Sequence, residues 1–493
     1  MIRHSNGHVP CRALAALAAL SALLGPAAAA AVLRVDSSLA GGANDGTSWA
    51  DAFRGAGGLR AALAASAPGD EIWVKAGTYT PHASDRSASL ELRDGVAVYG
   101  GFAGGETSLR ERDPAANATI LSGDLMGNDG PGGVHLEDNS FHVVSAAGLG
   151  PDSILDGFTI TAGNADGDGG AAQDRGGGLL CQAGGDATLR ACVFQGSRAA
   201  LDGGGACVHA SSPTFLRCEF SGNAAGLGGG AVRVVATSSP VILDCRFHAN
   251  QAAQGGAVAI SGGGTPALTN CAFWHNEAVG LFGGGAMVTD NGNLVAVRNC
   301  TFAANSAAFL AGGINNNGTT SIANCIFWMN AGPGGTGSAD QITTSGGVSV
   351  AWSLVQGGFA GVGNRDADPL FVDLGRGDLH LQAGLSPAID AGSNSSVPAG
   401  ITWDLDGNPR VVEDACIVAS GSGVAPFVDL GAYESQGVPC VADLDGNAQV
   451  NGADLGLLVG NWGGSGTGDL DGNGIVNGAD LGVLIGGWGP CCP

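Results

Sequence analysis

A short pattern of apolar and polar positions recurs along the middle of the chain, between residues 176 and 330. It reads Cys-x-Phe-x-x-Asn, and successive cysteines follow one another after 26, 27, 26, 29 and 25 residues. A cluster of glycines followed by a small apolar residue occurs once in each period. A constant period of this length predicts stacked, repeated structural units. The copies begin at Cys192, Cys218, Cys245, Cys271, Cys300 and Cys325, and the first has Ser197 in place of asparagine.

The residues within each period favour strands over helices. Short segments rich in β-branched residues alternate with glycine clusters, and no segment has convincing helical spacing. Cysteine and phenylalanine stand two positions apart, so on a strand both face the same side. Glycine and asparagine at fixed offsets are typical of corners that need a left-handed backbone. These features predict an all-β fold, a right-handed parallel β-helix over residues 71–365, with cysteine and phenylalanine ladders inside it.

Both ends of this solenoid are expected to differ from its middle. Residues 32–70 are expected to form an N-terminal cap, because residues 47–65 read as an amphipathic helix. Such a helix would cover the open edge of the sheets, which otherwise invites aggregation. After residue 365 the period fades, and residues 366–436 are expected to form a separate C-terminal β segment. The apolar residues spaced for one face of the N-terminal helix are Trp49, Phe53, Leu59 and Leu63.

The last fifty residues contain two twelve-residue loops, 26 residues apart, with oxygen-bearing side chains at positions 1, 3, 5, 9 and 12. This spacing suits a hard cation, because calcium takes six to eight oxygen ligands and a twelve-residue turn can wrap around it. Each loop runs into an apolar segment of helical length, Leu455 to Trp462 or Leu481 to Trp488. The loop residues are Asp443, Asp445, Asn447, Asn451 and Asp454, and then Asp469, Asp471, Asn473, Asn477 and Asp480.

The charge of this tail supports bound cations. From residue 441 to the end there are six aspartates and no Lys, Arg or Glu. Like charges in so small a unit repel one another. Two Ca²⁺ would change the formal charge of the tail from −6 to −2. The loops therefore predict two calcium sites rather than a solvated linker.

Duplicated loop–helix units with aspartate at position 12, followed by leucine, resemble type I dockerin repeats. The resemblance implies that the backbone carbonyls of Gln449 and Ile475 are further ligands, and that Asp454 and Asp480 bind calcium in bidentate fashion. It also implies that residues 441–490 bind a cohesin-like or other surface scaffold protein. Positions 10 and 11, which often contact cohesin in that family, are Gly-Ala in both copies.

The two loops are expected to differ in affinity. Position 6 is Ala448 in the first loop and Gly474 in the second. This position usually needs a left-handed backbone, which costs a residue other than glycine about 1–2 kcal/mol. We therefore expect the first calcium site to be the weaker one.

Two further resemblances concern the rest of the chain. The glycine clusters together with Phe-x-x-Asn are similar to repeats of bacterial polymorphic outer-membrane and related β-helix surface proteins. Residues 45–79 resemble the opening segment of exported β-helix proteins. Residues 366–434 resemble the C-terminal segment of such proteins that end in interchangeable surface-anchoring modules. These resemblances imply an exported protein held at a surface.

The N-terminus and the overall charge are consistent with an exported protein. Residues 1–31 read as a secretory signal peptide, with a basic start, an apolar stretch of twelve residues and small residues for cleavage. That stretch is too short to span a membrane as a helix. Asp plus Glu outnumber Lys plus Arg by 44 to 20, which disfavours binding to nucleic acid and to anionic membranes. We expect an extracellular or cell-surface location without a membrane span.

The cysteines fall into separate groups. Those of the ladder are expected to be buried as small hydrophobes, although neighbouring coils are close enough for disulfides. Cys181 and Cys207 lie one period apart, so a bridge between them is an alternative. Cys440 precedes the first loop, and a bridge to Cys491 or Cys492 would clasp the ends of the module. Cys416 would then pair with the remaining one or stay free.

No convincing active site is visible in the sequence. Asp166, Asp168, Asp174 and Arg175 form the best acidic cluster, for which an exposed turn is favoured over a calcium site or a catalytic site. His248 and His275 are possible bases. Trp274 and Trp328 should point outward, either stacking on sugar rings or packing at corners.

Three functions are compatible with these features. The favoured one is a tethered β-helix that binds or processes extracellular polysaccharide. The second is a polysaccharide lyase or a glycoside hydrolase delivered by the same tail. The third is a structural surface protein or adhesin without catalysis.

Overall fold

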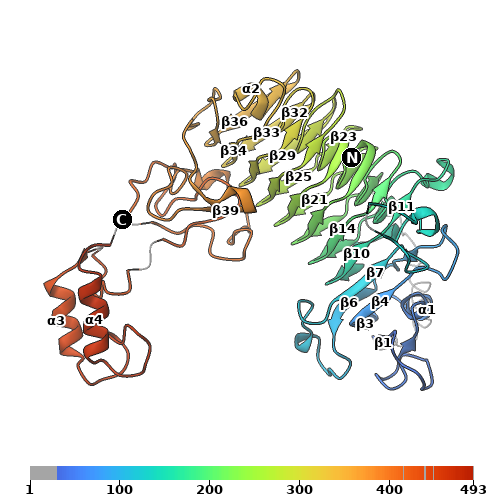
Figure 1. Cartoon of the computed structure of the whole chain (residues 1–493), viewed down its shortest axis with the longest axis horizontal. Coiled ribbons are helices and arrows are strands. Elements are labelled where there is room, and N and C mark those ends of the chain that lie inside the picture. Colours follow the sequence, from blue (N-terminus) through green and yellow to red (C-terminus); the bar gives the residue numbers. More distant parts are fainter. Residues whose placement is uncertain (1–29, 131, 415, 438–439, 448, 492–493) are drawn as a thin grey trace, which may run out of the picture.

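Four parallel sheets run along the middle of the molecule and carry the sequence repeat (Figure 1). The computed structural model describes residues 30–491 except residues 131, 415, 438–439 and 448. The expected signal peptide falls almost entirely outside the described residues. Each strand pairs in parallel with the equivalent strand of the next coil, so the described chain forms a parallel β-helix.

The two longest sheets follow the coils from one end of the β-helix to the other. In pairing order, the first contains β2 (Phe53–Arg54), β1 (Val32–Asp36), β3 (Glu71–Lys75), β6 (Ala97–Phe102), β9 (Ile154–Asp156), β13 (Thr188–Arg190), β17 (Thr214–Leu216), β21 (Val241–Leu243), β25 (Ala267–Thr269), β29 (Leu294–Arg298), β33 (Thr319–Ala323) and β36 (Gly347–Ala351). The second sheet contains β4 (Gly77–Tyr79), β7 (Thr119–Ser122), β10 (Thr159–Thr161), β14 (Val193–Gln195), β18 (Glu219–Ser221), β22 (Arg246–His248), β26 (Ala272–Trp274), β30 (Thr301–Ala303), β34 (Ile326–Trp328) and β37 (Leu354–Val355).

Two shorter sheets complete the coils. The third sheet contains β5 (Leu90–Glu91), β8 (Val144–Leu149), β12 (Leu179–Gly185), β16 (Ala206–His209), β20 (Val232–Val235), β24 (Val258–Ile260), β28 (Met287–Thr289), β32 (Ile314–Asn316) and β35 (Ile342–Thr344). The fourth sheet contains β11 (Asn164–Ala165), β15 (Arg198–Ala199), β19 (Ala224–Gly228), β23 (Gln251–Gln254), β27 (Glu277–Ala278) and β31 (Ser306–Ala307).

The predicted interior ladders are confirmed. Phenylalanine side chains from β14 to β34 are fully buried and stack coil on coil, with ring centroids 4.6–5.0 Å apart. This distance is the strand spacing within a sheet, so each ring lies against its equivalent in the next coil. The ladder cysteines lie beside the rings in the same core, and they are free thiols as expected.

The asparagines take two roles, and the sequence predicts one of them. Asn270, Asn299 and Asn324 stand at left-handed corners as expected, with φ of 50–54°, whereas the asparagine of Phe-x-x-Asn does not. Asn276 and its equivalents point into the coil, where the Asn276 amide donates to Phe247 O and to Asn305 Oδ1, both at 2.9 Å. The left-handed corner is the preceding residue, such as Ala249 at φ 53° or His275 at φ 52°. Asparagine stays inside because its amide satisfies backbone groups that the turn leaves unpaired.

The N-terminal region departs from the expected cap. Its helix, α1 (Gly58–Ala65), is shorter than residues 47–65, and β1 already belongs to the first sheet. Before α1 the chain turns instead, because the side chains of Asp45 and Ser48 accept backbone N–H groups. Leu59 and Leu63 join the main core. Phe53 joins the same core, and only Trp49 packs elsewhere, on the Trp73 and Phe102 cluster, so the expected shared face holds for three of the four residues.

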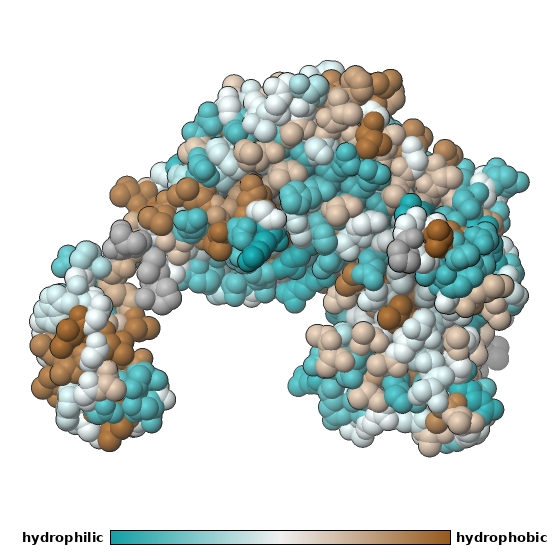
Figure 2. Space-filling model, viewed as in Figure 1, coloured by the Kyte–Doolittle hydropathy of each residue, from teal (hydrophilic) through white to brown (hydrophobic). Residues whose placement is uncertain are grey.

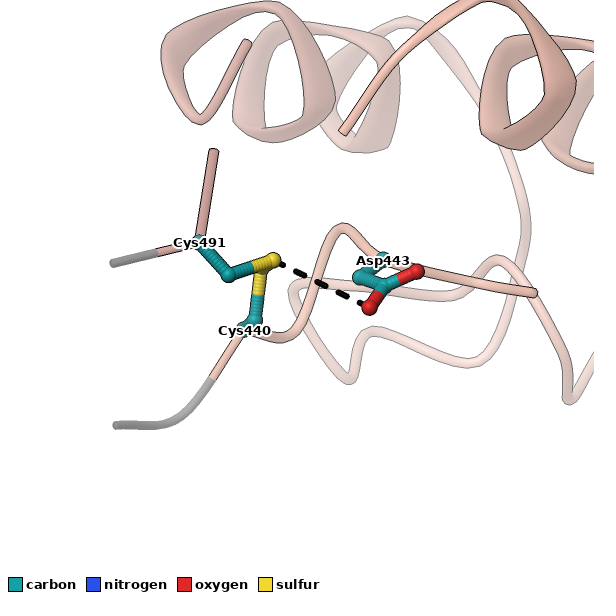
Figure 3. Close-up of side chains that lie close together, drawn as sticks. All are labelled: Cys440, Asp443 and Cys491. Atoms are coloured by element: carbon teal, nitrogen blue, oxygen red, sulfur yellow. Dashed lines mark hydrogen bonds between the residues drawn. A yellow bond between two sulfur atoms is a disulfide. The ribbon is translucent and has the colours of Figure 1, made fainter. Parts of the chain in front are cut away.

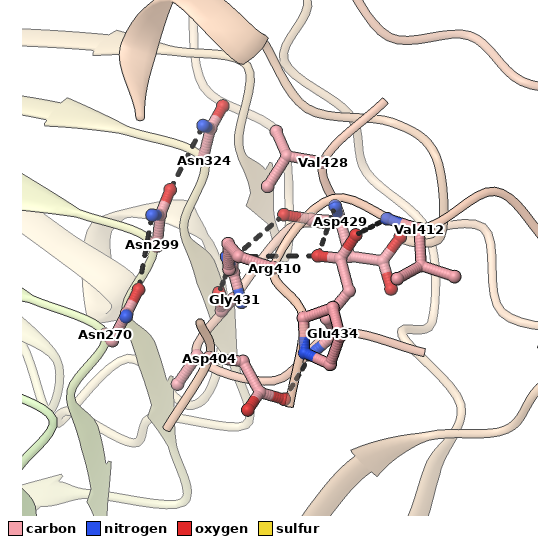
Figure 4. A network of polar contacts seen from close by, with 12 residues as sticks. Asn270, Asn299, Asn324, Asp404, Arg410, Val412, Val428, Asp429, Gly431 and Glu434 are labelled. Carbon is pink, nitrogen blue, oxygen red and sulfur yellow. Dashed lines mark hydrogen bonds and ion pairs between the residues drawn. The ribbon is translucent and has the colours of Figure 1, made fainter. Parts of the chain in front are cut away.

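The C-terminal segment, residues 366–436, lies against the outer face of the second sheet. Its regular structure among the described residues is one hairpin, β38 (Phe371–Asp373) and β39 (Asp378–Leu381), and two short 3₁₀ helices, η4 (Leu374–Arg376) and η5 (Asn394–Ser396). The short helix α2 (Ser338–Gln341) precedes β35 in the last coils. Leu379, Leu381 and Leu430 bury Ala272, Ala303 and Ile326 of the coils. At the corners, Asn270, Asn299 and Asn324 form a second, outer ladder, and Asn324 exchanges hydrogen bonds with Ser393 (Figure 4).

The tail contains α3 (Gly452–Gly460), α4 (Gly478–Gly486) and the short pair β40 (Gln449–Val450) and β41 (Gly489–Pro490). Both helices begin earlier than the apolar segments suggest. Asn451 and Asn477 cap them, and the aspartate three positions later accepts the N–H of the capping residue. Of the helices that the structure describes, none has the length and apolarity needed to cross a bilayer.

Candidate functional site

Each of the two tail loops gathers three carboxylates. Ligand atoms of Asp443, Asp445 and Asp454 lie within 4.8 Å of one another. The same holds for Asp469, Asp471 and Asp480 in the second loop. These are positions 1, 3 and 12 of each loop, which the sequence predicts as calcium ligands. The structure therefore brings the negatively charged members of each predicted set together.

The aspartate at position 12 is held by the backbone of its own loop. Asp454 Oδ1 accepts from Leu444 N at 2.7 Å and from Asp445 N at 3.2 Å, and its Oδ2 accepts from Asn451 N at 2.8 Å. Burial opposes ionisation of Asp454, but these N–H groups outweigh it and lower the pKa of the carboxyl. Backbone donors, led by Asn477 N, lower the pKa of Asp480 in the same way. Both carboxylates are thus kept ionised, as a cation ligand must be.

The remaining predicted ligands take part in hydrogen bonds within the loops. At position 5, the side-chain oxygens of Asn447 and Asn473 accept from the backbone two residues ahead. At position 9, Asn451 and Asn477 cap the helices. Their amides donate to the position-7 carbonyls, those of Gln449 at 3.2 Å and Ile475 at 2.9 Å. All these oxygens lie on the same loops as the carboxylates, and each already accepts a hydrogen bond within its loop.

Position 6 bears on the expected difference between the loops. Gly474 has φ 90°, a backbone that glycine adopts without strain. Its N–H donates to Asp469 Oδ2 at 2.8 Å, which ties the turn to a predicted ligand. Ala448 lies outside the described residues, so the weaker first site stays a prediction.

Asp480→Ala should weaken calcium binding more than Asp454→Ala does. Both variants lose the same helix cap, so they form a matched pair and the difference reports on the loops. If only the loop with Ala448 is left, its affinity should be about tenfold lower than that of the loop with Gly474. Calorimetric calcium titration of the two variants measures this, and equal affinities would show that position 6 does not matter.

The tail is closed by a disulfide between Cys440 and Cys491, with the Cα atoms 5.5 Å apart. Figure 3 shows it beside Asp443, whose Oδ2 lies 3.8 Å from Cys491 Sγ. The predicted disulfide between the two ends of the module is therefore confirmed. Cys416 is also disulfide-bonded, whereas its predicted pairing with Cys492 lies outside the described residues. Cys181 and Cys207 are free, and the alternative of a bridge between them was wrong because they occupy opposite faces of the third sheet.

The acidic cluster before the regular coils does not converge. Arg86 Nη2 donates to Asp166 Oδ1 at 2.5 Å. Asp168 accepts a hydrogen bond from Gly170 N inside its own turn. Asp174 pairs with its neighbour Arg175 at 2.9 Å. The three carboxylates thus have separate partners, and Asp166 and Asp168 are exposed whereas Asp174 is buried, which favours a structural turn over a joint site.

The two histidines and two tryptophans lie at the edge of the C-terminal segment or near it. His248 Nε2 is 3.0 Å from Glu219 Oε1, and its ring stacks on Trp274 at 4.3 Å. His275 is exposed at a left-handed corner. Trp274 and Trp328 point outward, as expected, but they pack against the C-terminal segment, which favours corner packing over sugar stacking.

A second polar cluster, which we call the seam, was missed by sequence reasoning. It joins the C-terminal segment to the second sheet and consists of Asp378, His380, Asp406, Tyr433 and Arg246. His380 Nδ1 lies 2.6 Å from Asp378 Oδ1 and its Nε2 lies 2.7 Å from Asp406 Oδ2. Asp406 also pairs with Arg246 at 2.5 Å. The residues are up to 187 positions apart in the chain, so no local pattern could have predicted the cluster.

Both ring nitrogens of His380 can donate at once only when the imidazole is protonated. Burial alone would lower the pKa of His380, but the hydrogen bonds to Asp378 and Asp406 outweigh it and raise the pKa. Burial raises the pKa of Tyr433, whose ring lies against His380. The imidazolium thus fills the space between the two carboxylates and acts as a link between them.

Protonated His380, between Asp378 and Asp406, should raise the free energy of unfolding of the C-terminal segment at acidic pH. This contribution should be lost at alkaline pH. Because the pKa of His380 is raised on folding, its contribution is complete below the ordinary histidine pKa and is lost as pH rises through the raised value. His380→Gln should lower the free energy of unfolding by about 1 kcal/mol near pH 5.5, allowing for solvent screening. The difference should vanish near pH 9. Urea unfolding of both proteins across this range measures it, and a constant difference would refute the role of protonation.

A comparison with protein families agrees with the coils. A family model described as "Right handed beta helix region" matches residues 127–302 and 177–351, which together cover less than half of the chain. The described coils are accordingly a right-handed parallel β-helix. A solved structure titled "Crystal structure of pectate lyase Pel9A" aligns with 82% of this chain and 96% of its own, at 14% identity and a TM-score of 0.46. No curated protein matches the sequence.

Proposed function

We propose that this protein is an exported β-helix protein whose tail binds two calcium ions and docks onto a cohesin-like or other surface scaffold protein. The observation that carries the proposal is the convergence of three aspartates in each tail loop, at identical loop positions. Their negative charge has no Lys or Arg to balance it from residue 441 to the end. Cations of high charge are the natural counterpart of such sites.

The docking part of the proposal is supported by an exposed apolar surface on the tail, which Figure 2 shows as a brown area. Three residues of the first half have counterparts 26 positions later in the second half. Each is at least 37% exposed, although all are large and apolar. Apolar surface of this kind on so small a unit is typical of a protein-binding site. The residues are Leu457, Val459 and Trp462, and then Val483, Ile485 and Trp488.

We further propose that the β-helix binds extracellular polysaccharide. The support is the seam together with the partly exposed side chains of the second sheet beside it. There Glu219, Arg246 and His248 project from neighbouring strands and stay partly exposed. Planar charged and amide groups on a rigid sheet can form paired hydrogen bonds with sugar hydroxyls.

Binding is favoured over glycoside hydrolysis at the seam. Asp378 and Asp406 flank the His380 ring, so the imidazole fills the gap in which a glycosidic oxygen or a water would have to lie. A polysaccharide lyase or hydrolase, or a purely structural surface protein, stays the alternative.

A panel of polysaccharides tests this part of the proposal. Wild-type protein should retain binding to at least one polysaccharide, and Arg246→Ala together with His248→Ala should weaken it. Arg376→Ala, at an exposed arginine of the C-terminal segment, is the control and should bind normally. Release of reducing or unsaturated ends would establish the enzyme alternative, and the absence of any binding or release would leave the structural one.

A further inference from the structure

The two halves of the tail brace each other's loops. After α3, Gly463 N donates to Val476 O and Val476 N donates to Gly464 O, both at 2.8 Å, so this linker lies along the second loop. After α4, Gly489 of β41 pairs with Val450 of β40 in the first loop. Gly489 is the equivalent of Gly463, and Val450 is the equivalent of Val476, at a shift of 26 residues. Each helix is thus followed by a short extended segment that hydrogen-bonds to the loop of the other half. We call these segments, residues 463–464 and 489–490, the straps.

The same shift relates the disulfide to an ordinary peptide bond. Ser465 and Gly466 join the strap of the second loop to the start of that loop. Their equivalents in the other half are Cys491 and Cys440, which are linked by the disulfide. The first loop is therefore closed by sulfur atoms where the second loop is closed by the main chain.

This junction directly contacts the first predicted ligand of the first loop. Asp443 N donates to Cys440 O at 3.0 Å, as Asp469 N donates to Gly466 O at 2.9 Å in the other half. Asp443 Oδ2 also lies 3.8 Å from Cys491 Sγ (Figure 3). Breaking the disulfide would release the start of the first loop together with Asp443. The second loop would keep its covalent closure.

We propose that the Cys440–Cys491 disulfide makes calcium binding by the first loop depend on the redox state. This inference rests on the calcium assignment made above. A dithiol reductant transfers two electrons and two protons to the disulfide, which yields two cysteine thiols and the cyclic disulfide of the reductant. The ligand set of the first loop must then be ordered during binding instead of being held beforehand. Because disulfides form in oxidising compartments, the complete module assembles only after export.

The test uses the full chain in two loop-selective forms. Asp480→Ala leaves only the first loop competent, and Asp454→Ala leaves only the second. Treatment with dithiothreitol should lower the calcium affinity of the first form about tenfold or more, and that of the second form less than about twofold. The Cys440→Ala/Cys491→Ala pair should reproduce the loss without reductant. Cys416→Ala is the control for the other disulfide and should respond to dithiothreitol as the wild type does.

The outcomes separate this inference from the proposal on which it rests. Equal affinities before and after reduction in the first form, or equal losses in both forms, would overturn the redox inference alone. Absence of calcium binding in the oxidised wild type would overturn the calcium assignment itself. Far-UV circular dichroism of the reduced protein in calcium should keep its helical signal from the second half, and complete loss would contradict selectivity for the first loop.

Discussion

Removal of calcium is expected to unfold residues 441–490 and to leave the β-helix intact. The core of the tail is small, with five buried apolar residues, and its six aspartates repel one another without cations. A ligand present at a thousand times its dissociation constant stabilises the folded state by about 4 kcal/mol per site. That amount is a large share of the stability of a unit this small.

Limited proteolysis with and without a calcium chelator measures the effect. Cleavage should become rapid within residues 441–490, while the stacked coils stay protected. The Asp454→Ala/Asp480→Ala variant should be cleaved at the same rate in calcium as the wild type in chelator. A tail that resists cleavage without calcium, or coils that unfold with it, would contradict this account.

Replacing Arg410 is expected to cause the largest loss of stability in the C-terminal segment. The guanidinium is fully buried, and its Nη2 donates to Gly431 O at 2.5 Å and to Asp429 O at 3.2 Å (Figure 4). Its Nε lies 3.8 Å from Glu434 Oε2. Burial raises the pKa of Asp429 to about 7, and Arg410 opposes that rise. Arg410 thus offsets the charge of the buried Glu434 carboxyl group. Among the described residues, no other cation forms an ion pair with Glu434.

Arg410→Met should lower the free energy of unfolding of the segment by about 3–5 kcal/mol, because it leaves buried acidic groups uncompensated. Arg376→Met, at a side chain that is 89% exposed, is the matched control and should change stability by less than about 0.5 kcal/mol. Glu434→Gln added to Arg410→Met should restore part of the loss. Urea unfolding followed by proteolysis of residues 366–436 measures all three variants. Equal unfolding midpoints for Arg410→Met and Arg376→Met would contradict the role of the buried charge.

The sequence predicts the repeated parts of this molecule better than the parts that occur once. The Cys-x-Phe spacing puts both residues on one face of a strand, and their apolar character puts that face inside. The asparagines before the ladder cysteines stand at left-handed corners as predicted. The asparagine of Phe-x-x-Asn was assigned the wrong role, because buried turns need its amide. The N-terminal helix was made too long, because the side chains of Asp45 and Ser48 satisfy backbone groups in a way that apolar spacing does not register.

The candidate sites differ in the same way: one is formed by residues close in sequence and the other by residues far apart. The loop aspartates are close in sequence, so their spacing alone predicts that they converge, and the clasp follows from cysteines at both ends of the module. The seam could not be predicted, since Arg246 and His380 meet only because the C-terminal segment folds back onto the second sheet. Calcium binding by the loops stays a prediction.

The number of calcium ions bound per chain tests the central claim most directly. Isothermal titration of the full-length protein should give two ions for the wild type and one for either Asp454→Ala or Asp480→Ala. The double variant should bind none. A wild type that binds no calcium, or a double variant that binds as much as the wild type, would show that the paired loops are not calcium sites.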